Sequence, residues 1–236
     1  MEMLLNYESN FIWTMDKLSF DQGRYVNAFR DFYDRKYNRT IYNCYKLPGN
    51  YLSVYEYQVD NGFIITRGTE AIKVNVTAWD FHKNKSNIEF YIQANPSKNP
   101  TIALDSSTTW VKHNENSTIE KDGFKAYIPS GTFYDDVPLT YQITENKSAA
   151  VYSDIHQMHH RLIPMHKAAV IQIEPKNVPE QYKDKVVMVH KDLKNVDQVL
   201  TTFWKDEMIT AKCKEVGTFY AKLDLSLIHI SEPTRR

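Results

Sequence analysis

The alternation of apolar and polar residues is the feature that most constrains the fold of this chain. Phe124–Ile128 and residues 139–143 each place an apolar side chain at every second position, which is the period of a strand with one buried face. Between these segments, Pro129 has no backbone N–H to donate and Gly131 can adopt a positive φ, so the chain is expected to turn there. We therefore predict an all-β fold of antiparallel strands.

The same pattern and its interruptions divide the chain into two modules. The segments KVNVTAWD and IEFYI alternate on either side of a polar turn, which predicts a hairpin over residues 73–92 with Asp80 capping the turn. Two prolines in NPSKNPT then mark a linker. We predict an immunoglobulin-like β-sandwich over residues 1–95, incomplete at its N-terminus, a linker over residues 96–101 and a second β-sandwich module over residues 102–224. In an incomplete first module, the first strand is expected to expose an unpaired edge.

Shorter patterns add strands and turns to both modules. Asn61 and Gly62 predict a tight hairpin turn that leads into the segment FIIT. Residues 24–37 fit a short helix by their spacing and a strand by their Tyr and Phe content, and both interpretations stay open. In the second module, strands are expected at residues 168–173, 186–190, 203–204, 208–212 and 218–223.

The composition is that of a folded chain without an extreme charge. Of 236 residues, 42% are hydrophobic and 13% are aromatic, which is enough to form cores. The 29 Lys and Arg residues balance the 29 Asp and Glu residues, so no nucleic-acid partner is expected, and no apolar run reaches the length of a membrane span. Cys44 and Cys213 lie far apart in the sequence and are predicted to be free thiols.

Four histidines, His156, His159, His160 and His166, fall within eleven positions and suggest a zinc site. Their spacing argues against it, because the adjacent pair points to opposite faces of a strand and no HExxH motif surrounds them. Asp154 is the only carboxylate close to them in the sequence. We expect structural or surface histidines and assign no catalytic, cofactor-binding or metal-binding residue. A zinc enzyme centred on the first, second and fourth of these histidines stays an alternative.

The other polar and aromatic groups fit the same interpretation. Asp135 and Asp136 suit a turn cap better than a calcium or acid–base site, because adjacent strand positions diverge. The sixteen tyrosines favour cross-strand packing, with a glycan-stacking platform as the alternative. No GxxxxGK, GxGxxG or GxSxG motif occurs, so the residues of this chain predict no phosphate loop and no serine nucleophile.

Several segments resemble a known family. DGFKAYIPSGTFYDD, VYSDIHQMHHRLIPMHKAAVIQI and KCKEVGTFYAKLD are similar to the C-terminal β-rich region of lysostaphin-type zinc metallopeptidases of Bacteroidetes, which cut peptidoglycan cross-bridges. MDKLSFDQGRYVNAF and KLPGNYLSVY resemble the immunoglobulin-like module that follows the catalytic domain in such proteins. The resemblance spans residues 3–224 and leaves out the catalytic domain. The zinc ligands of the family include a His-x-His, which this chain lacks, so no ligand is carried over.

The resemblance implies a non-catalytic accessory region of an exported, peptidoglycan-hydrolysing zinc metalloendopeptidase. Such a region would position or stabilise an upstream catalytic domain, which would be its partner and would hold the zinc. Peptidoglycan or a cell-surface glycan is a further expected partner, and the parent protein is expected in the periplasm or cell envelope. A stand-alone cell-surface β-sandwich module that binds glycan or protein is the alternative.

Both ends of the chain suggest truncation. Residues 225–236, LSLIHISEPTRR, resemble the translation of a sequencing adapter and are left out of the fold prediction. The residues after Met1 have neither the basic region nor the apolar region of a signal peptide. Under the resemblance, the export signal and the catalytic domain are expected upstream, and Met1 is expected to be an internal methionine.

Overall fold

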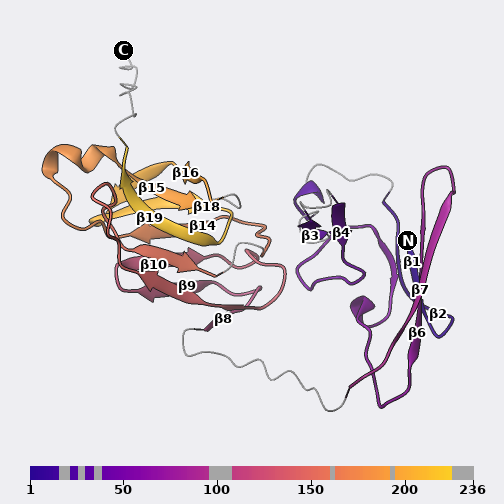
Figure 1. Cartoon of the computed structure of the whole chain (residues 1–236). Helices are drawn as coiled ribbons and strands as arrows, with labels where there is room; N and C mark the ends of the chain where they lie inside the picture. Colours follow the sequence, from indigo (N-terminus) through magenta and orange to yellow (C-terminus); the bar gives the residue numbers. More distant parts are fainter. Residues whose placement is uncertain are drawn as a thin grey trace. The chain divides into compact units, whose positions relative to one another are not determined.

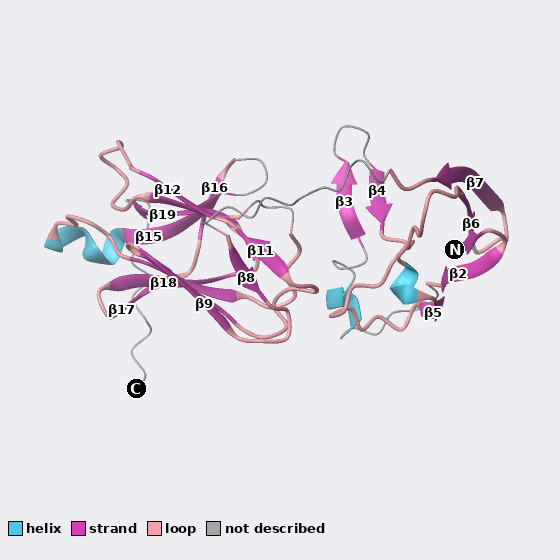
Figure 2. Ribbon diagram, turned by 90° about the horizontal axis from the view of Figure 1, so that it is seen from below, coloured by secondary structure: helices cyan, strands magenta, loops and turns pink. Residues whose placement is uncertain are grey.

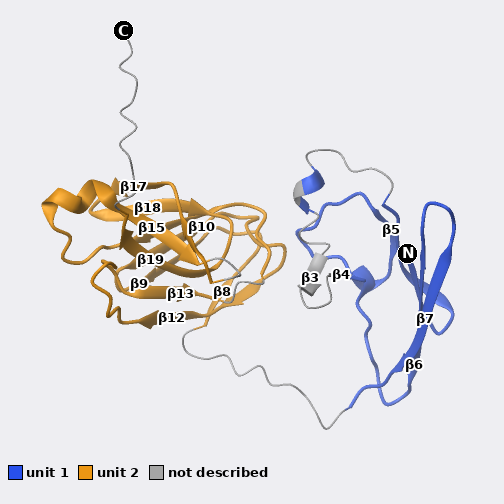
Figure 3. Cartoon of the chain, turned by 45° about the horizontal axis from the view of Figure 1, so that its top comes forward, with its two compact units in different colours: residues 1–103 blue, residues 104–236 orange. Residues whose placement is uncertain are grey.

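The computed structural model describes residues 1–15, 22–25, 30–34, 39–95, 108–159, 163–191 and 195–224. The chain divides into two compact units, Met1–Ala103 and Leu104–Arg236 (Figure 3). Strands make up 48% of the structure and helices 7%, so the predicted all-β fold is confirmed (Figure 2). The predicted linker lies outside the described residues. None of the helices among the described residues has the length and apolarity that a membrane crossing requires.

Unit 1 is built on one five-stranded antiparallel sheet with the strand order β5-β2-β1-β6-β7. Its strands are β1 (Glu2–Leu5), β2 (Glu8–Trp13), β5 (Tyr55–Gln58), β6 (Ile72–Trp79) and β7 (Lys85–Ile92). A separate two-stranded sheet pairs β3 (Arg30–Asp34) with β4 (Arg39–Tyr42). The short 3₁₀ turn η1 (Gln22–Tyr25) precedes it, so the segment with two open interpretations contains both a helical turn and a strand.

The first strand of unit 1 lies in the middle of its sheet. β1 pairs with β2 on one side and with β6 on the other. The predicted unpaired edge on the first strand is therefore wrong, and the edge strands are β5 and β7. The reason is that a tight turn at Asn6 and Tyr7, with φ of 48° and 72°, supplies one partner and the long-range return of the chain through β6 supplies the other.

The core of unit 1 is small and covers only part of the sheet. Met3, Phe11 and Val74 are at most 3% exposed and lie on one face. Ile88 and Phe90 lie on this same face, since Phe90 pairs directly with Val74, but they are 60% and 40% exposed. The apolar face is thus buried over β1 and β2 and open over β7.

The predicted hairpin of unit 1 is confirmed by the pairing of β6 with β7 along all eight residues of each strand. Asp80 caps its turn, because one carboxylate oxygen accepts the backbone N–H of Asn84 at 2.9 Å and the other accepts its side-chain amide at 2.8 Å. The side-chain and backbone hydrogen bonds from Asn84 lower the pKa of Asp80. The alternation of residues 73–92 thus corresponds to the register of a regular hairpin.

The predicted hairpin turn at Asn61 and Gly62 is wrong. These residues end the 3₁₀ turn η2 (Asp60–Gly62), and residues 63–66 after it are not a strand. Both residues have the expected positive φ, 55° and 85°. A Cβ added to Gly62 would lie 2.6 Å from the carbonyl oxygen of Cys44, so this glycine permits the close approach of two backbone segments instead of reversing a hairpin.

Unit 2 is a sandwich of two five-stranded antiparallel sheets (Figure 1). The first has the strand order β17-β18-β14-β10-β9 and the second has the order β12-β13-β19-β15-β16. A further two-stranded sheet pairs β8 (Thr109–Val111) with β11 (Val137–Leu139). The remaining elements are β9 (Ser117–Lys121), β10 (Phe124–Ile128), β12 (Tyr141–Thr144), β13 (Ile155–Met158), β14 (Ala169–Ile173), the 3₁₀ turn η3 (Glu180–Lys185), β15 (Val186–Lys191), β16 (Asp197–Val199), β17 (Thr202–Lys205), β18 (Met208–Cys213) and β19 (Gly217–Leu223).

The residues at alternate strand positions fill the space between the two sheets of unit 2, as the sequence pattern predicts. Phe124, Ala126 and Ile128 of β10 are at most 1% exposed, whereas Tyr127 is 42% exposed. Phe219 of the facing sheet is fully buried in the same core cluster. The five strands predicted after residue 168 correspond to β14, β15, β17, β18 and β19 and are confirmed.

The alternating segment at residues 139–143 is divided between two sheets. Leu139 ends β11, and Tyr141 begins β12, which belongs to a different sheet. β10 pairs with β9 and β14, so the turn at Gly131 does not join two neighbouring strands of one sheet. Periodicity alone does not distinguish one strand from two short strands that change partners within three residues.

Candidate functional site

The predicted histidine cluster is dispersed by the fold. His156 on β13 is 1% exposed and faces the core, where its ring stacks on Phe124 with centroids 5.1 Å apart. Its Nδ1 shares a hydrogen bond of 2.7 Å with the hydroxyl of Tyr141. Burial lowers the pKa of His156 to about 4 and raises the pKa of Tyr141 to about 12. A neutral imidazole thus completes the packing between the two sheets.

The other histidines of the cluster have separate partners. His159 follows β13 with a φ of 57°, and its Nδ1 lies 3.2 Å from the hydroxyl of Thr140. Nδ1 of His166 lies 3.2 Å from the hydroxyl of Tyr134. His160 lies outside the described residues. Within the described ranges, no group of three clustered metal-ligating side chains contains any of these histidines.

Asp154, the carboxylate nearest the cluster in sequence, pairs elsewhere. One of its oxygens accepts a hydrogen bond from the ammonium of Lys176 at 2.6 Å, and this interaction lowers the pKa of Asp154. The charge of Asp154 raises the pKa of His156, but burial of the ring lowers this pKa by more. The acidic residue that would complete a metal site is therefore used in a surface ion pair.

The buried His156 predicts a pH-dependent stability of unit 2. The pKa of His156 is about 4 in the folded chain, below its ordinary value of 6.5. Between these two pH values the unfolded chain therefore binds a proton at this residue more readily than the folded chain does. The stability that the neutral ring contributes is present above pH 6.5 and is lost as the pH falls toward 4. Urea denaturation should show a loss of about 2 kcal/mol between pH 7 and pH 5 from this residue.

A His156→Gln variant provides the comparison for this pH dependence, because glutamine fills similar space and does not titrate in the window. Its absolute stability is expected to be lower than that of the original chain, since the ring contact with Phe124 is lost. Its slope of stability against pH between 7 and 5 is expected to be much shallower. Equal slopes in the two proteins would contradict the assignment of the buried neutral ring.

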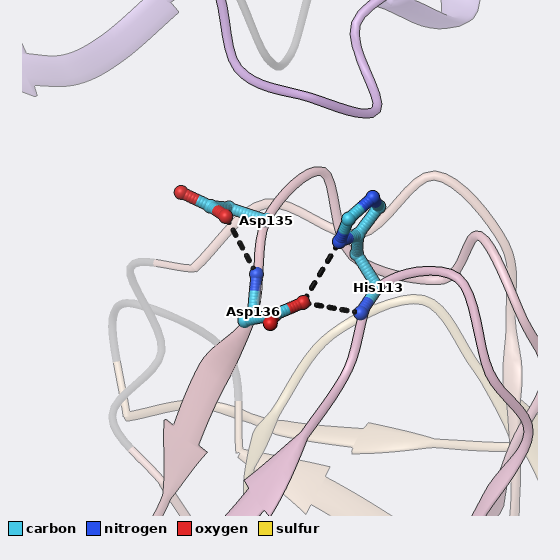
Figure 4. Close-up of side chains that lie close together, drawn as sticks. All are labelled: His113, Asp135 and Asp136. Carbon is cyan, nitrogen blue, oxygen red and sulfur yellow. Dashed lines mark hydrogen bonds and ion pairs between the residues drawn. The ribbon is translucent and has the colours of Figure 1, made fainter.

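The one group of three metal-ligating side chains that the described residues bring together is His113, Asp135 and Asp136, whose ligand atoms lie within 4.8 Å of one another. One oxygen of Asp136 accepts the backbone N–H of His113 at 2.9 Å and lies 2.8 Å from its Nδ1 (Figure 4). One oxygen of Asp135 accepts the backbone N–H of Asp136 at 2.8 Å. The group therefore ties two chain segments together next to β8 and β11.

These hydrogen bonds make the group a turn cap. Hydrogen bonds from His113 hold the pKa of Asp136 below its ordinary value; the bond from the backbone N–H has the larger effect and the bond from the side chain adds to it. A cation bound at these atoms would have to replace hydrogen bonds that are already formed, and the three side chains are at least partly exposed. The expected divergence of Asp135 and Asp136 is wrong, because both residues precede β11 and their ligand atoms lie within 4.8 Å of each other. Each accepts a backbone N–H as a cap does, but the N–H that Asp136 accepts belongs to His113 in a separate segment.

Sequence reasoning missed the partner of this cap, because His113 lies 23 residues before Asp136. The signal lies in the strand register. Val111 pairs with Val137 at the end of the β8–β11 sheet, so continuing this register places residue 113 opposite residue 135. The pairing of two three-residue strands is too short to be recognised from periodicity.

The comparisons with known proteins concern the unit that contains these groups. Residues 108–224 match the Zu5-like domain family. We call this segment the Zu5-like region; it takes in the strands from β8 to β19 and therefore the whole sandwich. A comparison with curated proteins finds no match for the chain.

The outer face of the Zu5-like region carries one further polar network that the sequence analysis missed. Asp197 on β16 accepts hydrogen bonds from the hydroxyl of Tyr220 and from the ammonium group of Lys222, the latter at 2.9 Å, and Lys191 lies 3.3 Å away. Burial raises the pKa of Asp197, but these hydrogen bonds outweigh it and the pKa falls to about 2. A carboxylate held ionised by three donors fastens an edge strand and is poorly suited to accept protons near neutral pH.

The two cysteines are free, as predicted. Cys213 on β18 of the Zu5-like region is buried, and burial raises the pKa of its thiol to about 11. Cys44 in unit 1 is partly buried, and burial raises the pKa of its thiol as well. Since the thiolate is the reactive form, both residues pack as small apolar groups and neither is prepared as a nucleophile.

Proposed function

We propose that this chain is a non-catalytic accessory region of an exported, peptidoglycan-hydrolysing zinc metalloendopeptidase, where it positions or stabilises the catalytic domain. The observation that carries the proposal is the use of the histidines in the segment that resembles this family. His156 fills the core beside Tyr141. His166 contacts Tyr134, so these two histidines have different partners and do not form a shared metal site. The resemblance of residues 3–224 to the accessory region of such enzymes supplies the enzyme class.

The organisation of the chain supports an accessory role. Each unit has its own sheets and its own buried cluster, which is the construction of modules that are joined in series. The described ionisable groups with large pKa shifts, such as His156 and Asp197, are satisfied by neighbours within the fold. Under the proposal, the zinc and the water that it activates belong to the upstream catalytic domain.

The proposal is tested by sequencing the source DNA upstream of Met1 and expressing the encoded protein with and without residues 1–224. We expect an export signal and a domain with a His-x-His strand. We further expect the catalytic domain to hydrolyse peptidoglycan sacculi more slowly, or to unfold at lower temperature, when it lacks this chain. A stop codon directly upstream of a genuine start at Met1 would contradict the proposal, as would stoichiometric zinc bound by the purified chain itself.

A stand-alone module that binds glycan or protein at the cell surface is the second candidate, and the β6–β7 hairpin favours it. Phe81 in its turn is 95% exposed, and Ile88 and Tyr91 on β7 are 60% and 64% exposed. Exposed aromatic faces are common at binding surfaces because they stack on sugars and on apolar side chains. Cosedimentation with sacculi that is lost in the Phe81→Ser, Tyr91→Ser variant, but kept in Phe203→Ser, would support this candidate.

A further inference from the structure

A pocket of about 260 Å³ lies in unit 1 between the β1–β2 hairpin and the segment that follows β5. Leu5, Val59 and Ile65 form apolar parts of its lining. Phe63 adds an aromatic wall, which is fixed by stacking on Tyr45 with centroids 4.8 Å apart. The volume is below the roughly 300–1,000 Å³ of pockets for drug-sized ligands, so it suits one side chain with its adjoining peptide group.

Asn10 lines this pocket with an amide that lacks a partner. The residue is only 5% exposed, and its Nδ2 is buried without any hydrogen bond. Most buried polar groups have a partner, because an unpartnered one keeps the cost of losing its contact with water. Asn10 lines the pocket, and rotation about its broad amide torsion can turn this buried NH₂ group toward a ligand. The missing partner is therefore a group that a ligand can supply.

The backbone around Asn10 explains why this side chain lies there. Met3 pairs with Phe11 and Leu4 pairs with Ser9, so Asn10 is the extra residue of a β-bulge in β2. Its backbone oxygen accepts the N–H of Val59, which fastens the bulge to the opposite side of the pocket. Bulges redirect side chains next to binding sites, and this one places an amide where regular pairing would place none.

The charged side chains of the lining indicate the charge of a matching ligand. Glu8 and Asp60 supply two carboxylates and Arg67 supplies one guanidinium, so acidic side chains outnumber basic ones in the lining. A cationic group on an apolar stem matches this combination of carboxylates and apolar walls. The guanidinium and the Asn10 amide are suited to the carbonyl oxygens of a peptide backbone.

We propose that this pocket binds a peptide segment through a lysine-type side chain. The methylene groups lie against Leu5 and Val59, the ammonium group meets Glu8 and Asp60, and the amide of Asn10 bonds the adjoining peptide group. A neutral sugar ring fits less well, since it brings no cation to the carboxylates of Glu8 and Asp60. The inference goes beyond the proposed function, because it depends on unit 1 alone and holds with either candidate function.

The test is an NMR titration of the full chain with Nα-acetyl-L-lysine N-methylamide. We expect shifts of the Asn10 side-chain amide and of the backbone of residues 59–67, with a Kd on the order of 1 mM. Nα-acetyl-L-norleucine N-methylamide, which keeps the apolar stem without the charge, is expected to bind more weakly, and added salt is expected to weaken the lysine probe. Equal binding of the two probes would overturn the proposal, as would tighter binding of N-acetylglucosamine at the same residues.

Three variants locate the interaction. Glu8→Gln and Asp60→Asn are each expected to weaken the lysine probe by about twofold to fivefold, and asparagine tolerates the left-handed φ of 48° at position 60. Asn10→Leu is expected to abolish the shifts while the unfolding temperature stays the same or rises, because it removes an unpartnered buried amide. Glu56→Gln, on β5 outside the lining, is the matched control and should bind as the original chain does. Full binding by Asn10→Leu or by the Glu8→Gln, Asp60→Asn double variant would refute the site.

Discussion

Replacing Phe124 by alanine is expected to destabilise unit 2 by about 3–5 kcal/mol, the usual cost of removing a buried phenylalanine side chain. Phe124 is 1% exposed at the centre of the sandwich. Its ring lies 5.4 Å from that of Tyr141 and 6.4 Å from that of Phe219, so it joins the two sheets. The substitution leaves a cavity that strands on both sides cannot close without losing their register.

The cavity also affects the polar pair in this core. The ring of His156 stacks on Phe124, and its hydrogen bond with Tyr141 depends on that position. Once the aromatic neighbour is removed, water can enter and the depressed pKa of His156 should rise toward its ordinary value. The variant is therefore expected to lose part of the pH dependence of stability as well as stability itself, which hydrogen exchange of unit 2 at pH 7 and pH 5 would measure.

Tyr127→Ala is the matched control for this substitution. Tyr127 lies on the same strand three residues later, with its side chain 42% exposed on the opposite face. Its loss is expected to cost less than about 1.5 kcal/mol, because little buried area is removed. Similar losses for both variants would show that the two faces of β10 are equally buried and would contradict the sandwich described here.

The core strands were predictable because apolar residues occur at every second position in their sequences, and these are the residues that become buried. Ile171 and Ala211 pair across neighbouring strands and are fully buried, and both lie within segments predicted as strands. The described histidines of the cluster, His156, His159 and His166, contact separate partners within the fold, as the structural interpretation expects. These conclusions need only the local direction of side chains, which alternation determines.

Features that depend on long-range approach were not predictable in the same way. The pairing of His113 with Asp136 requires the register of two three-residue strands. The pocket at Asn10 requires a bulge, which inserts one residue without a compositional signal. The position of β1 inside its sheet depends on a partner more than sixty residues later in the chain. Such contacts are fixed by packing between segments, about which the local pattern says little.

Gly62→Ala is expected to destabilise unit 1 by about 3 kcal/mol or more, through two effects that add. A φ of 85° is strained for alanine, and its Cβ would lie 2.6 Å from the carbonyl oxygen of Cys44. The same Cβ would lie 2.7 Å from Cδ2 of Phe11, a fully buried side chain of the small core. Because a backbone oxygen and a packed ring cannot move away cheaply, the loop before β5 and the turn η2 must separate.

Gly68→Ala separates the two contributions. Gly68 has a similar φ of 77°, but nothing lies within 4 Å of the position that its Cβ would occupy. It should therefore show only the cost of the left-handed backbone, about 1–2 kcal/mol, and the difference between the two variants measures the close approach at Gly62. Hydrogen exchange of peptides from unit 1 reports both losses. Equal losses of stability in the two variants would mean that the segment carrying Cys44 can move away from the added Cβ at little cost. Tyr45 lies in this segment, so its stacking on Phe63 would then give the wall of the pocket no rigid support.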